Sequence, residues 1–150
     1  MVLSERDLAD VGRLRAARAR QAVARLDYLR GVRALSRRVT QVELARVLGV
    51  SQSAVSRTLS EEAKIPPVRA GFHGGGPVEV IQRFMTGELS REQVVDELVS
   101  WPYEQAVATG VEGPPIGGSF DDVVRCVHEG LLPPDLYDAV RGQVVRPGVN

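Results

Sequence analysis

The sequence predicts an all-α fold with two helical parts. Apolar residues recur at intervals of three and four along most of the chain, which is the spacing of one face of an α-helix. Serines that can cap a helix precede several of these stretches, and glycines or prolines follow them. A glycine-rich segment at residues 71–77 interrupts the pattern. We therefore expect a first helical domain over residues 1–70, a linker over 71–77 and a second, small helical domain over 78–150.

The first element is predicted to be one long helix from Ser4 to about Arg38. Ser4 can cap its start, with Asp7 as the reciprocal partner three residues later, and the stretch contains no proline. In the second half of this helix, apolar residues follow a four-three-four spacing and are expected to pack on the helices that come next. These residues are Tyr28, Val32, Leu35 and Val39.

Residues 40–59 predict two short helices joined by a tight turn. One face of the first helix, over about 41–48, is apolar and is made of Leu44, Val47 and Leu48. Gly49 follows at the helix end, where a reversal of the chain requires a positive φ that other residues adopt only with strain. Val50 is then expected to fill the turn between the two helices.

The second short helix is predicted to be amphipathic. Ser51 is a good N-cap, and Val55 and Leu59 form the apolar face. The opposite face carries Gln52, Ser53, Ser56 and Arg57. A helix that turns small polar side chains and an arginine outward fits the major groove of DNA, where such side chains can reach the base edges.

Residues 40–59 resemble the helix-turn-helix of the lambda-type phage repressor and Cro superfamily. That family places alanine, glycine and apolar residues at the positions that are here Ala45, Gly49, Val50 and Val55. Thr58 departs from the pattern, since the family usually has Ile, Leu or Val there, and Leu59 is expected to supply that packing instead. The resemblance implies a helix-turn-helix DNA-binding domain within the all-α fold.

The resemblance also implies roles for individual side chains. Gln41, which follows Thr40 at the start of the first helix, would contact a phosphate and brace Gln52. Gln52 and Ser53 would reach base edges, and glutamine can pair with adenine N6 and N7. Arg57 would either read a guanine or hold a phosphate. The expected DNA-binding residues of this segment are Thr40, Gln41, Ser51, Gln52, Ser53, Ser56 and Arg57.

The charge of the chain is zero in total but unevenly distributed. Residues 1–70 contain 14 basic and 7 acidic residues, a net charge of +7, whereas residues 71–150 contain 5 and 12, a net charge of −7. The basic half holds the helix-turn-helix candidate, and neutralisation of phosphates supplies most non-specific affinity for DNA. The arginine-rich first half of the long helix could pair with a second protomer, lie along a DNA backbone or remain in solvent. For a backbone contact the candidates are Arg13, Arg15 and Arg18.

The sequence of the second half predicts further short helices. Its tryptophan and its cysteine are expected to have a structural role. Ser90 with Gln93 forms the pattern of a capping box, and Ser119 is expected to cap a later helix. Trp101 and the single cysteine, Cys126, are expected in the core. This acidic domain is expected to serve self-association or to bind a protein partner.

The sequence offers no signature of catalysis or of a bound cofactor. His73 and His128 are far apart and have no ligand at metal spacing, and no nucleophile motif or nucleotide-binding glycine pattern is present. We therefore expect no catalytic residue, no metal and no cofactor. The absence of a long apolar stretch and of a signal-peptide core predicts a cytoplasmic protein without a membrane partner.

These observations predict a sequence-specific, double-stranded DNA-binding transcriptional regulator that acts as a homodimeric repressor. Two alternatives remain open. One is an antitoxin-type autoregulator whose acidic half binds a toxin or another protein, and the other is an adaptor that binds DNA with little sequence preference.

Overall fold

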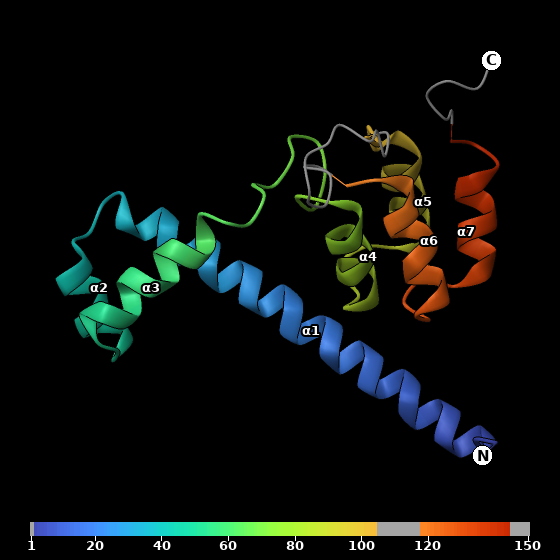
Figure 1. Cartoon of the computed structure of the whole chain (residues 1–150), viewed down its shortest axis with the longest axis horizontal. Coiled ribbons are helices and arrows are strands. Elements are labelled where there is room, and N and C mark those ends of the chain that lie inside the picture. The colour runs from blue at the N-terminus through green and yellow to red at the C-terminus, as the bar shows by residue number, and fades with distance from the viewer. Residues whose placement is uncertain (1, 105–117, 145–150) are drawn as a thin grey trace, which may run out of the picture. The chain divides into compact units, whose positions relative to one another are not determined.

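The computed structural model describes residues 2–104 and 118–144, which contain seven helices and no strand (Figure 1). The predicted all-α class is therefore confirmed for these residues. The helices are α1 (Glu5–Ser36), α2 (Gln41–Leu48), α3 (Gln52–Glu62), α4 (Pro77–Met85), α5 (Arg91–Ser100), α6 (Phe120–His128) and α7 (Pro134–Arg141).

The chain divides into two compact units whose boundaries differ from those of the expected domains. The small unit is Gln21–Pro66, and the large unit combines Met1–Arg20 with Pro67–Asn150. Helix α1 contributes residues to both units. The glycine-rich segment at 71–77, which was expected to be a linker, lies inside the large unit.

Helix α1 begins as predicted, and its buried face agrees with the predicted one in part. Asp7 Oδ2 accepts hydrogen bonds from the Ser4 hydroxyl (2.7 Å) and from the Ser4 N–H (3.0 Å), and these bonds lower the pKa of Asp7. The Asp7 N–H donates in return to Ser4 Oγ at 3.1 Å. Val32 is buried as expected, whereas Tyr28 and Leu35 are 47% and 38% exposed. Leu29 is buried instead. Successive residues of a helix are about 100° apart around its axis. Tyr28 can therefore face the solvent although Leu29, the next residue, is buried.

Helices α2 and α3 form a pair joined by a turn at Gly49, as the sequence predicts. Gly49 has φ +70°, in the left-handed region that favours glycine. The hydroxyl of Thr40 accepts a hydrogen bond from the Glu43 N–H at 3.2 Å, and that of Ser51 accepts one from the Ala54 N–H at 3.0 Å. Each helix start is therefore fixed by a side-chain cap.

The core of the small unit is narrower than the sequence predicts. It consists of Val32, Leu44, Ala45, Val55 and Leu59, with Val39 packed against it. Leu44 is buried as expected, but Val47 and Leu48, the other two residues of the expected apolar face of α2, are exposed, Val47 by 59%. Val50 is exposed as well, so it does not fill the turn as expected. The face of α2 that contacts its neighbours in this unit is centred on Leu44 and Ala45, and Val47 points to one side of it.

Hydrogen bonds from α1 arginines fasten the end of α3 in the small unit. Arg33 Nε donates to Glu62 Oε2 at 2.8 Å, and Arg33 Nη2 donates to the Leu59 carbonyl oxygen at 3.1 Å. The Leu59 carbonyl lies in the last turn of α3 and also accepts a hydrogen bond from the Ala63 N–H at 3.1 Å. These contacts hold the orientation of α3 where the apolar core is small.

Helices α4–α7 surround the core of the large unit (Figure 1). Trp101 and Cys126 are buried in it, which confirms the predicted structural role of both side chains. Phe72 packs edge-to-face on Trp101, with ring centroids 4.8 Å apart. Burial raises the pKa of the Cys126 thiol to about 11, so this thiol is inert at neutral pH.

The glycine-rich segment belongs to the large unit because it holds a buried charge. The Gly75 N–H donates to Glu79 Oε1 at 3.0 Å, and a Cβ placed on Gly74 would lie only 3.0 Å from the Glu79 Cβ. Glu79 in turn accepts a hydrogen bond from Arg83 Nε at 2.9 Å. The glycines therefore allow a close approach of the backbone to a buried carboxylate.

Candidate nucleic-acid interface

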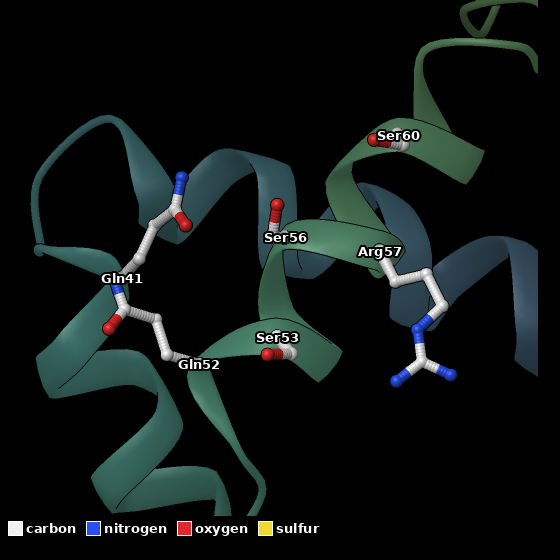
Figure 2. A pocket seen from close by; sticks show the side chains of 6 residues that line it. All are labelled: Gln41, Gln52, Ser53, Ser56, Arg57 and Ser60. Atoms are coloured by element: carbon white, nitrogen blue, oxygen red, sulfur yellow. The ribbon is translucent and has the colours of Figure 1, made fainter.

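An open groove of about 490 Å³ lies where α2 and α3 begin (Figure 2). One lining residue comes from α2 and five come from α3. They are Gln41, Gln52, Ser53, Ser56, Arg57 and Ser60. Five of these side chains are among the predicted DNA-binding residues, and the structure brings them together. Ser60 was not predicted, although it lies one further turn along the face of Ser53, Ser56 and Arg57.

The outward direction of this face follows from what α3 buries. Val55 and Leu59 are 1% and 8% exposed, so the residues on the opposite side of the helix face the solvent. The expectation that Leu59 supplies packing in the place of Thr58 is confirmed. The Thr58 hydroxyl donates to the Ala54 carbonyl oxygen at 2.9 Å, which satisfies this half-buried side chain locally.

Within the groove, the lining residues are arranged along its length. Figure 2 shows Gln41 and Gln52 at one end and Arg57 extending away from them. Gln41 and Gln52 each offer one carbonyl oxygen and one amide group, and three serines offer hydroxyls. Such a set of donors and acceptors can recognise flat polar edges and has no apolar side chain among its members.

Thr40 and Ser51 stabilise the helix starts at which the groove lies. Their hydroxyl oxygens already accept the cap hydrogen bonds at the starts of α2 and α3, and neither residue lines the groove. The two helix starts carry the positive ends of their dipoles, which favour a nearby anion. A DNA contact by either hydroxyl, acting as a donor, stays a prediction.

Arg57 in the groove and Arg46 on α2 differ in the hydrogen bonds that their guanidinium groups make. Arg46 donates from Nε to Glu43 Oε2 at 3.1 Å, and this pairing lowers the pKa of Glu43. Arg57, in contrast, makes no ion pair and no hydrogen bond from its guanidinium to any residue that the structure describes. Its donors are therefore available to a ligand.

The three arginines predicted on the long helix do not line this groove. Arg13, Arg15 and Arg18 lie on α1, in the part of it that belongs to the large unit. Arg13 donates to Asp10 Oδ1 at 2.8 Å in an exposed pair, which carries little stability.

The large unit contains a smaller pocket of about 210 Å³. It is lined by Val68, Phe72, His73, Arg83 and Glu88. Arg83 is held there by Glu79 and Glu88, and His73 Nδ1 lies 2.6 Å from Glu97 Oε1. Arg83, Glu88 and His73 thus each already have a hydrogen-bond partner within the large unit.

Over the ranges 2–104 and 118–144, no group of acidic, histidine or cysteine residues is arranged to hold a metal ion. None of the helices in these ranges is both long and apolar enough to cross a membrane. Comparisons with known families, with characterised proteins and with solved structures find no match to the chain.

Proposed function

We propose that the protein is a transcriptional regulator that binds double-stranded DNA in a sequence-specific manner and acts as a homodimeric repressor. The observation that carries the proposal is the polar groove at the starts of α2 and α3. Pockets for small molecules are lined mostly by apolar side chains, whereas this groove is lined by glutamine, serine and arginine. Base edges in the major groove present the complementary donors and acceptors.

In this mechanism α3 enters the major groove with its N-terminal turn foremost. Gln52 pairs with an adenine through N6 and N7, and Ser53 contacts an adjacent base. Arg57, whose guanidinium is free of protein partners in the described structure, binds guanine O6 and N7 or a phosphate. Gln41, at the start of α2, contacts a phosphate beside the groove. The small unit thereby works as a helix-turn-helix domain.

A homodimer follows from the size of this surface. One helix start reads only a few base pairs, and two copies on half-sites one DNA turn apart raise the specificity. The proposal therefore includes a pair of half-sites with centres about 10 base pairs apart, or a multiple of that distance.

The direct test is a selection of bound duplexes from a random pool with the full chain. The expected result is one enriched motif made of two half-sites, either inverted or directly repeated. A binding curve that is steep in salt but indifferent to sequence would contradict the proposal and favour the adaptor. The absence of any duplex binding at low salt would discard DNA binding altogether.

The triple variant Arg13→Ala/Arg15→Ala/Arg18→Ala is expected to lower the salt dependence of DNA binding without changing the preferred sequence. Each phosphate contact contributes about 0.9 to the slope of log Kobs against log salt, so three lost contacts reduce its magnitude by up to about 2.7 per protomer. Titrations at several salt concentrations measure this slope. An unchanged slope would show that these arginines do not touch phosphates.

A further inference from the structure

The turn between α1 and α2 presents two arginines that the groove does not include. Arg37 and Arg38 are both exposed, and their guanidinium groups make no ion pair or hydrogen bond with any residue that the structure describes. The backbone of the turn is nevertheless fixed. The N–H groups of Arg38 and Val39 both donate to the Leu35 carbonyl oxygen at 2.9 Å.

These two residues differ from most other arginines of the small unit. Four arginines of this unit donate to acceptors within it: Arg25 to Glu61, Arg30 to the Pro66 carbonyl oxygen, Arg33 to Glu62 and Arg46 to Glu43. The three whose guanidinium groups find no acceptor among the described residues are Arg37, Arg38 and Arg57. Arg57 lines the polar groove, so one arginine of this group already marks the candidate interface.

The chain places Arg37 and Arg38 close to the other end of the same groove. Gln41 lines the groove and follows Arg38 by three residues, a stretch that spans at most about 11 Å when extended. The major groove of DNA is about 12 Å wide, with a phosphate backbone along each side. The backbone of Arg38 therefore lies within about 11 Å of that of Gln41, and a long arginine side chain that starts there can extend to a phosphate beside the bases.

We propose that Arg37 and Arg38 are phosphate anchors that fix the position of the small unit on duplex DNA. This inference rests on the proposed function, because it requires that the polar groove faces the base edges. Arginine binds phosphate through charge-assisted and often bidentate hydrogen bonds, and such contacts carry no sequence information. The anchors supply affinity and register, while Gln52 and its neighbours supply the choice of sequence.

The test is the salt dependence of duplex binding by the full chain carrying Arg37→Ala/Arg38→Ala. We expect the magnitude of the slope of log Kobs against log salt to fall by about 1.8 per protomer, equally for the selected and for unrelated duplexes. The matched control is Arg25→Ala/Arg46→Ala, which removes the same number of positive charges from side chains that already have acidic partners. Its slope should stay closer to that of the wild type.

A second variant separates the anchor from a structural role. Arg37→Lys/Arg38→Lys keeps the charge and should restore most of the slope, since lysine also binds phosphate as a point charge. An unchanged slope in the alanine variant, or an effect confined to one DNA sequence, would overturn the inference while leaving the proposed function intact. Absence of DNA binding by the wild type would instead remove the proposed function, and the inference with it.

Discussion

Gln52→Ala and Arg57→Ala are each expected to weaken binding to the selected duplex about 5- to 150-fold. This range corresponds to about 1–3 kcal/mol, the discrimination that one bidentate contact between a side chain and a base provides. Both side chains line the groove, and both lie opposite the buried face of α3, so their removal leaves the core unchanged. Titration of the full chain at a fixed salt concentration measures the effect.

A change in the preferred sequence of a variant identifies the base that the removed side chain reads. For Arg57→Ala, weaker binding with an unchanged preference would assign Arg57 to a phosphate. A repeated selection with Gln52→Ala should lose its preference at one position of each half-site and keep the others. Gln21→Ala and Arg25→Ala serve as matched controls, because these exposed residues lie on α1 and do not line the groove. Equal affinity of both groove variants and both controls for the selected duplex would discard the docking of α3 in the major groove.

Arg83→Met is expected to destabilise the large unit by about 3–5 kcal/mol. Glu79 is 6% exposed and Arg83 is 8% exposed, and Arg83 Nε donates to Glu79 Oε2 at 2.9 Å. Removal of the guanidinium would leave a buried carboxylate without its cationic partner, a change that is far more costly than the loss of a surface pair. The free energy of unfolding, measured in chemical denaturant, reports this cost.

The double variant Glu79→Gln/Arg83→Met provides the control for that experiment. It removes both buried charges, and the glutamine can still accept the hydrogen bond from the Gly75 N–H. Its stability should therefore be closer to that of the wild type than the stability of Arg83→Met. A loss below about 1 kcal/mol in Arg83→Met would mean that water reaches Glu79 and that the pair behaves as an exposed one.

Local signals allowed the elements around the candidate interface to be predicted from the sequence. The cap at Ser51, the positive φ at Gly49 and the apolar pair Val55 and Leu59 each depend on neighbours a few residues away. Because the buried pair fixes the rotation of α3, the outward position of Gln52 and Arg57 could be predicted with it. The DNA contact itself stays a prediction.

The sequence alone could not show which arginines of the small unit form ion pairs and which do not. Arg33 and Arg37 are chemically identical and four residues apart, yet Arg33 donates to Glu62 across a separation of 29 residues. The partner of a long charged side chain depends on which elements pack together. The sequence therefore indicated a basic first half without indicating which of its charges are available to a ligand.

By itself, the sequence determined the all-α class, the position of the short helices α2 and α3 and the polar face of α3, because helix periodicity, caps and the turn glycine act within a few residues. Only the tertiary structure decided that Leu29 and not Tyr28 is buried, that Val47 remains in solvent and that the glycines at 74–75 enclose the carboxylate of Glu79. The physical reason is that burial and ion pairing depend on contacts between residues that packing brings together.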